Sequence, residues 1–157
     1  MGLFRLGPKT TYLHVCTNQA DPFYDGDVVD VDPILLADYE LAPGDRIHFE
    51  LVGDFNNGVT EVARGMGVFS SNDTLLAATE SHRVPGAIEA GEDYVTGPTH
   101  GCGEQTTDIP EDFAYDTPKT VAIPAGATHL FLCVRDTWYG DNSDLDDDCG
   151  VNLWKLP

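Results

Sequence analysis

The loop Asp136–Asn142 has the composition of a calcium site. It holds two carboxylates, Asp136 and Asp141, and the side-chain amide of Asn142, around a turn at Gly140. Calcium in proteins takes about six to eight oxygen ligands from carboxylates, amides and backbone carbonyls. A turn by itself needs only a glycine or an asparagine, whereas crowded carboxylates repel one another unless a cation lies between them. The loop therefore predicts calcium as the cofactor.

An acidic tail follows this loop, with four aspartates between residues 144 and 148. An EF-hand that began at Asp144 would need a glycine at its sixth position and a glutamate at its twelfth, but these positions hold Cys149 and Lys155. Runs of charged residues usually face solvent. We therefore interpret the tail as a solvated connection between two strands.

Other polar residues are weaker candidates for contact with a ligand. His82 and His100 lie in the glycine- and proline-rich segment 82–113, as do Asp108 and Glu111. Long loops in compact domains are usually functional or tied down, so these four side chains could reach a bound ligand. The alternative is that the histidines are solvated and that the second pair belongs to a proline-stiffened turn.

The segment Ala20–Pro33 offers a possible second cation site. It contains five aspartates, at positions 21, 25, 27, 30 and 32. The alternative is ordinary turn chemistry, since aspartate and glycine are both common in turns.

Short β-strands must position these loops. In Ile47–Leu51 apolar residues alternate with polar ones, and Thr11–Cys16 and Val151–Trp154 follow the same period of two. Leu130–Val134 is apolar throughout, which predicts a buried central strand directly before the candidate loop. Val62–Phe69 predicts a strand that glycines interrupt.

Turn signals separate these strands, at Pro43-Gly44-Asp45 and at Pro124-Ala125-Gly126. Apolar residues nowhere recur with a sustained helical period. We therefore expect an all-β fold, a β-sandwich of the jelly-roll kind, as a single domain over residues 1–157.

The bulk composition excludes several partners. The chain carries 27 acidic residues against 8 lysines and arginines, a net charge of -19, which disfavours nucleic acid and anionic lipid. No apolar run is long enough to span a bilayer, and no signal peptide is visible. The serine-hydrolase, zinc-protease and phosphate-loop motifs are absent, so we expect no enzymatic activity.

The four cysteines, Cys16, Cys102, Cys133 and Cys149, show no Cys-x-x-Cys spacing. An even number in an acidic, lysine-poor chain favours disulfides and an extracellular or cell-surface location. Three pairings are possible, of which we prefer Cys133–Cys149; the alternative is four buried free thiols.

Two stretches resemble the PA-IL-like (LecA-like) bacterial lectins. The first runs from Ile123-Pro124-Ala125-Gly126 to Leu132 and continues with Asp136 and Trp138-Tyr139-Gly140-Asp141-Asn142-Ser143. The second runs from Leu41-Ala42-Pro43-Gly44-Asp45 to Asp54-Phe55-Asn56-Asn57-Gly58. Members of that family are jelly-roll proteins that bind galactose through calcium.

The resemblance implies a ligand set for calcium. Asp136, Asp141 and Asn142 would give side-chain oxygens, and Trp138 and Asn57 would give backbone carbonyls. Two neighbouring sugar hydroxyls would complete the coordination, which places all five residues in the sugar site as well. The other candidates for contact with that sugar are His82, His100, Asp108 and Glu111. The partner would be a glycan of the galactose type, and a weak single site would make a homo-oligomer useful.

This chain departs from the family prototype in three respects. The spacing from Asp136 to Tyr139 is shorter, an aspartate stands at 141 in place of asparagine, and the sugar-contacting loop with His and Gln has no clear match. The sequence therefore leaves open a calcium-stabilised structural or adhesion module without a sugar site, and more remotely a hydrolase.

Overall fold

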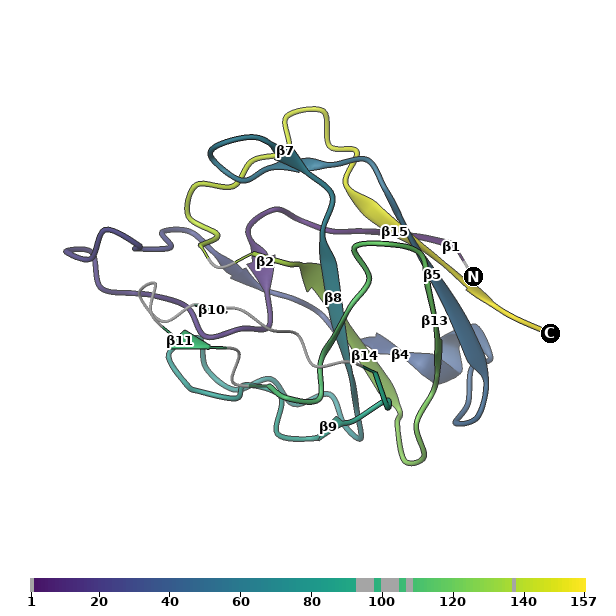
Figure 1. Ribbon diagram of the computed structural model, residues 1–157. Coiled ribbons are helices and arrows are strands. Elements are labelled where there is room, and N and C mark those ends of the chain that lie inside the picture. The colour runs from purple at the N-terminus through teal and green to yellow at the C-terminus, as the bar shows by residue number, and fades with distance from the viewer. Residues whose placement is uncertain (1, 93–97, 100–104, 107–108, 137) are drawn as a thin grey trace.

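The computed structural model describes residues 2–92, 98–99, 105–106, 109–136 and 138–157, and almost all of its regular structure is β-strand (Figure 1). The only helical element in this part of the chain is a short 3-10 helix, η1 (Leu36–Tyr39). None of the described helical structure is long and apolar enough to cross a membrane. The prediction of an all-β fold is confirmed.

The first of two larger sheets is antiparallel and has the order β1 (Gly2–Arg5), β15 (Gly150–Lys155), β5 (Arg46–Val52) and β13 (Lys119–Ala122). On β5 the side chains of Ile47 and Phe49 are fully buried, whereas His48 is half-buried and Glu50 is exposed. The predicted alternation is therefore confirmed, and it fixes which face of the sheet meets the core.

The second sheet has the order β12 (Phe113–Ala114), β8 (Gly65–Ser70), β14 (His129–Val134) and β4 (Ile34–Leu35), with β9 (Ala87–Ile88) also paired to β8. Leu130–Val134 is buried on both faces, as the unbroken apolar run predicts. Strand β14 runs antiparallel to β8 over its whole length, from His129 opposite Ser70 to Val134 opposite Gly65. This buried strand delivers the chain to the candidate loop.

Aromatic rings join the two larger sheets. The ring centroid of Phe49, on β5, lies 5.4 Å from that of Phe113 and 5.2 Å from that of Tyr115. All three side chains are fully buried. Three two-stranded sheets complete the described strands: β2 (Thr10–Thr11) with β3 (Val29–Asp30), β6 (Phe55–Asn56) with β7 (Glu61–Val62), and β10 (Pro98–Thr99) with β11 (Gln105–Thr106). No sheet that the described residues form closes on itself.

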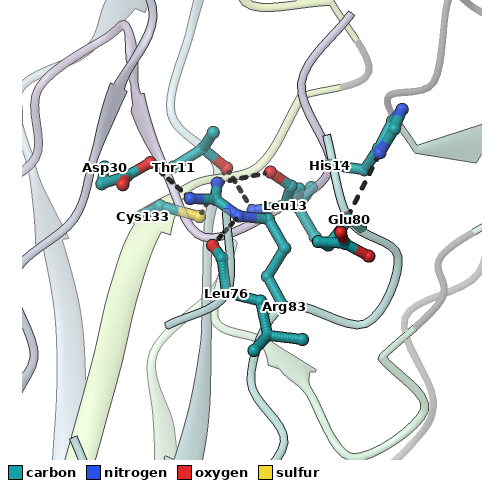
Figure 2. A network of polar contacts seen from close by, with 8 residues as sticks. All are labelled: Thr11, Leu13, His14, Asp30, Leu76, Glu80, Arg83 and Cys133. Carbon is teal, nitrogen blue, oxygen red and sulfur yellow. Dashed lines mark hydrogen bonds and ion pairs between the residues drawn. The ribbon is translucent and has the colours of Figure 1, made fainter. Parts of the chain in front are cut away.

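The predicted strand Thr11–Cys16 is wrong beyond Thr11. Leu13 and Val15 are buried, yet their backbone is irregular. The carbonyl of Leu13 accepts a hydrogen bond from the buried guanidinium of Arg83 (2.8 Å) (Figure 2). The N–H of Val15 donates to the carbonyl of Ala78 (2.8 Å). These long-range partners satisfy the backbone in place of a neighbouring strand.

The preferred disulfide Cys133–Cys149 is also wrong, because both residues are free thiols and both are buried. Burial raises the pKa of each thiol to about 12, which keeps it protonated and unreactive near neutral pH. The one pairing still open joins Cys16 to Cys102, and Cys102 lies outside the described residues.

Candidate functional site

Two loops that are distant in sequence meet at the predicted calcium site. The backbones of Asn56 and Ser143 form an antiparallel bridge, with Asn56 N–H donating to Ser143 (2.7 Å) and Ser143 N–H donating to Asn56 (2.9 Å). The antiparallel register of this bridge places Asn57 opposite Asn142. The contact joins the strand pair β6–β7 to the loop that follows β14.

The closest contact between the two loops involves Gly58 and Asp141. A Cβ atom at Gly58 would lie 1.9 Å from Oδ2 of Asp141, so only a glycine leaves room for this carboxylate. Gly58 also has a φ of +89°, which residues with a Cβ atom rarely adopt.

Side-chain oxygens of two predicted ligands are buried and accept no hydrogen bond from the described residues. These atoms are Oδ1 of Asp141 and Oδ1 of Asn142. The Asn142 side chain is 3% exposed, and its Nδ2 donates to the carbonyl of Pro8 (2.9 Å), which fixes the direction of the amide. A buried acceptor without a donor costs free energy, and a cation is the simplest partner for two such oxygens.

Electrostatic repulsion adds to this cost. Burial raises the pKa of Asp141, and the nearby carboxylates of Asp136 and Asp25 raise it further, while Lys9 acts in the opposite direction. The carboxylates of Asp136 and Asp25 thus disfavour the negative charge of Asp141. A divalent cation among these carboxylates would attract them and so replace their mutual repulsion with a favourable interaction.

Asn57 can offer its backbone carbonyl but not its side chain. Its side-chain Oδ1 already accepts hydrogen bonds from Val59 N–H (3.1 Å) and Thr60 N–H (2.9 Å). These bonds close the turn that leads into Glu61. The donor set at this site is therefore consistent with calcium: carboxylates, one amide oxygen and backbone carbonyls.

The aromatic pair in the loop is anchored in the protein. The Tyr139 side chain is fully buried and its hydroxyl donates to the carbonyl of Val134 (2.6 Å), so Tyr139 is the core anchor. Trp138 is half-buried, and its Nε1 donates to the carbonyl of Tyr24 (3.1 Å). Its ring and that of Phe23 pack edge-to-face, with their centroids 5.7 Å apart. Both side chains hold the loop in place.

The other predicted sugar contacts are only partly described. His82 and Glu111 meet each other, with Nε2 of the histidine 3.1 Å from Oε2 of the glutamate. His100 and Asp108 lie outside the described residues. The structure therefore brings together one pair of the four, across 29 residues of sequence.

Four of the five aspartates of Ala20–Pro33 have separate partners within the protein. Asp25 is buried against backbone N–H groups, Asp27 pairs with Lys9 (3.0 Å), and Asp30 pairs with Arg83. Asp21 accepts a hydrogen bond from the N–H of Phe23 (2.8 Å). The described contacts thus favour local structural roles over a second cation site in this segment.

Sequence reasoning missed a second acidic group. Carboxylate oxygens of Asp54, Asp146 and Asp148 lie within 4.8 Å of one another, which brings the acidic tail against the start of β6. Asp146 and Asp148 are exposed, as predicted for a solvated tail, but Asp54 is half-buried. Loss of solvent and the charges of Glu61 and Asp148 raise the pKa of Asp54. The sequence near Asp54 gives no signal that it contacts aspartates about 90 residues further along the chain.

A pocket of about 390 Å³ lies beside this group. It is lined by Asp54, Asn56, Glu61, Ser143, Leu145 and Asp146. Asn56 and Ser143, which form the bridge between the two loops, thus also line this pocket.

Comparisons with protein-family models, with curated proteins and with solved structures find no match to this chain.

Proposed function

We propose that this protein is a calcium-dependent lectin that binds terminal galactose, or a related sugar, through hydroxyl groups on the bound calcium. One observation carries the proposal: the oxygens of Asp141 and Asn142 that are buried and have no hydrogen-bond partner among the described residues lie where the loop of Asn57 meets the loop after β14. Calcium accounts for these oxygens and for the crowded carboxylates together.

The proposed ligands follow from this arrangement. Side-chain oxygens come from Asp136, Asp141 and Asn142, and backbone carbonyls come from Trp138 and Asn57. The residues present fit the ion, since all are hard oxygen donors and two of the oxygens are buried and accept no hydrogen bond within the described part of the chain. Calcium supplies a Lewis-acid centre to which neutral, neighbouring sugar hydroxyls can bind.

The sugar class rests on the resemblance to the PA-IL-like lectins. The motif Trp138-Tyr139-Gly140-Asp141-Asn142-Ser143 carries that resemblance, and the packing of the two larger sheets supports a jelly-roll sandwich of the same kind. A glycan partner also suits an extracellular or cell-surface, non-enzymatic protein that gains avidity from homo-oligomers.

Retention on immobilised galactose in millimolar calcium tests the proposal. We expect the wild type to be retained and to be released by a chelator. Asp136→Ala and Asn142→Ala should pass through unretained, because each removes a calcium ligand. Asp73→Ala, which removes an exposed carboxylate elsewhere, should be retained like the wild type.

A second candidate is a calcium-stabilised adhesion module without a sugar site. It is favoured by one contact: His82 and Glu111, two of the predicted sugar contacts, bind each other. In that case a chelator would lower the melting temperature, while a broad glycan array would show no binding. Glycan binding that the chelator abolishes would exclude this candidate.

A further inference from the structure

Asp25 is a carboxylate in an unusual place. It is fully buried, and both of its oxygens accept backbone hydrogen bonds: Oδ2 from Cys16 N–H (2.7 Å) and Oδ1 from Tyr139 N–H (3.0 Å). A carboxylate loses much solvation free energy on burial, so these charge-assisted bonds must offset a large cost. The second bond spans 114 residues of sequence and ends inside the proposed calcium loop.

The residues around Asp25 fit closely against the same loop. The carbonyl of Tyr24 accepts the indole N–H of Trp138 (3.1 Å). A Cβ atom at Gly140 would lie 2.6 Å from that carbonyl and 3.1 Å from Cα of Asp25. Tyr24 and Asp25 therefore form a rigid support for Trp138–Gly140, and Gly140 is required for this close approach.

The bond from Tyr139 N–H has a consequence for the residue before it. This N–H and the carbonyl of Trp138 belong to one planar peptide unit, and the structure contains no cis peptide bond among its described residues. In a trans peptide the N–H and the carbonyl point in opposite directions. When Asp25 fixes the Tyr139 N–H, it also turns the Trp138 carbonyl away from itself.

We propose that Asp25 is the positioning residue of the calcium site: it orients the Trp138–Tyr139 peptide so that the Trp138 carbonyl faces the ion. The inference rests on the proposed calcium site and gives Asp25 a role outside the ligand set. The negative charge on the N–H side also polarises the peptide, which makes the carbonyl oxygen a better ligand. Residues that orient metal ligands in this way commonly change metal affinity about 10- to 100-fold when they are replaced.

Asp25→Asn tests the role. Asparagine has the same shape but only one acceptor oxygen, so it cannot accept from both Cys16 N–H and Tyr139 N–H. We expect its calcium dissociation constant to rise by at least about tenfold. Asp27→Asn is the matched control: it removes the same charge two residues away, from a side chain that is 85% exposed, and should bind calcium like the wild type.

A terbium experiment separates positioning from a purely structural role. Terbium replaces calcium at oxygen sites, and the luminescence lifetimes in light and heavy water report how many water molecules bind the ion. Loss of the Trp138 carbonyl as a ligand should add about one bound water in Asp25→Asn. A folded variant with unchanged affinity and an unchanged water count would overturn the inference and leave the proposed function intact.

Amide hydrogen exchange of the wild type covers the case in which Asp25→Asn does not fold. The Tyr139 N–H should be protected in the calcium-free protein as well as in the loaded one, because Asp25 holds it before the ion binds. Rapid exchange without calcium would contradict this. A wild type that binds neither calcium nor terbium would overturn the proposed function and the inference together.

Discussion

Gly58 lies where the turn after Asn57 meets the carboxylate of Asp141. Its φ of +89° and the space that Asp141 Oδ2 occupies both require a residue without a Cβ atom. These are two separate requirements, one on the backbone and one on the site. A second glycine, Gly44, shares the first requirement but not the second, since its φ is +94° and a Cβ there would meet nothing within 4 Å.

Gly58→Ala and Gly44→Ala should therefore differ in calcium affinity. Each should lose about 1–2 kcal/mol of stability, because alanine is strained in the left-handed region. Only Gly58→Ala should weaken calcium binding, because its Cβ displaces the Asp141 carboxylate. Thermal unfolding in chelator and calorimetric titration with calcium measure the two effects. Equal calcium affinities in the two variants would show that Asp141 is not a ligand in this position.

Asp45 gives the molecule a pH-dependent contact outside the proposed calcium site. Its Oδ2 accepts hydrogen bonds from the N–H of Ala42 (2.9 Å) and from Lys155 (2.9 Å). The bond from Lys155, and then that from Ala42, lower the pKa of Asp45 from its ordinary 3.8. A group with a lowered pKa stabilises the fold above 3.8 and loses this contribution as the pH falls through its folded pKa.

Asp45→Asn should accordingly lower the melting temperature at pH 7, where the charged contact is intact. The gap between variant and wild type should shrink as the pH falls below the ordinary pKa of 3.8. Because the contact is exposed, the gap should also shrink in high salt. A difference that stays constant from neutral to acidic pH would mean that the charge of Asp45 contributes nothing.

At the scale of elements, one bridge holds the two ligand-bearing loops together. Asn56 and Ser143 exchange two backbone hydrogen bonds, and the nearest larger elements are the β6–β7 pair and the end of β14. Ser143→Pro should remove the N–H that donates to Asn56 and separate the loops, whereas Ser143→Ala keeps that N–H. We expect calcium affinity to fall at least about tenfold in the proline variant only. Equal affinities would show that the bridge does not organise the site.

Arg83 joins the N-terminal segment to the residues after β8 (Figure 2). Its guanidinium is fully buried; it donates to the carbonyls of Leu76 (2.9 Å) and Leu13 (2.8 Å) and pairs with Asp30. These bonds support the irregular backbone after β2, where the alternating sequence pattern predicts a strand. A buried charge with this many partners leaves them unsatisfied when it is removed.

Arg83→Met keeps the length of the side chain but removes every donor, so we expect it to lower the free energy of unfolding by about 3 kcal/mol. Arg46→Met, at an exposed position, should change it by less than about 0.5 kcal/mol. Urea unfolding of both variants measures this difference. Similar values for the two would mean that the buried network contributes little to stability.

The elements that the sequence predicts well are those whose pattern depends only on burial. Strand β14 is predicted by an unbroken apolar run and β5 by alternation, since each face of these strands meets one environment. The segment after Thr11 has an alternating pattern too, but its backbone partners are Arg83 and Ala78, which local sequence cannot reveal. Apolar alternation thus predicts burial more reliably than it predicts a strand.

The candidate site also contains residues that the sequence predicts and residues that it does not. Asp136, Asp141 and Asn142 are visible as a local cluster of oxygen donors. Asp25 and Asp54 are not, because each reaches its partners from a distant part of the chain: Asp25 at Tyr139, and Asp54 at the acidic tail. Long-range contacts of this kind follow from topology, which composition and spacing do not specify.

At the scale of the whole molecule, a net charge of -19 affects both acidic regions. Such a chain repels itself, so any cation screens it and divalent ions bind weakly at many places. A general gain in stability with calcium is therefore weak evidence for a site. Only a variant that keeps every charge of the chain and yet loses the tight binding event distinguishes a built site from diffuse attraction.

Calorimetric titration of the metal-free protein with calcium at physiological ionic strength makes this distinction, with the wild type, Asn142→Ala and Asp146→Asn compared. Asn142→Ala removes a buried neutral oxygen of the proposed site, whereas Asp146→Asn removes a charge from the exposed acidic group at the pocket. The proposed site predicts one tight calcium-binding event in the wild type. Asp146→Asn should retain this event, and Asn142→Ala should weaken it at least about tenfold. A tight event that survives in Asn142→Ala and disappears in Asp146→Asn would contradict it and would place the ion at Asp54, Asp146 and Asp148.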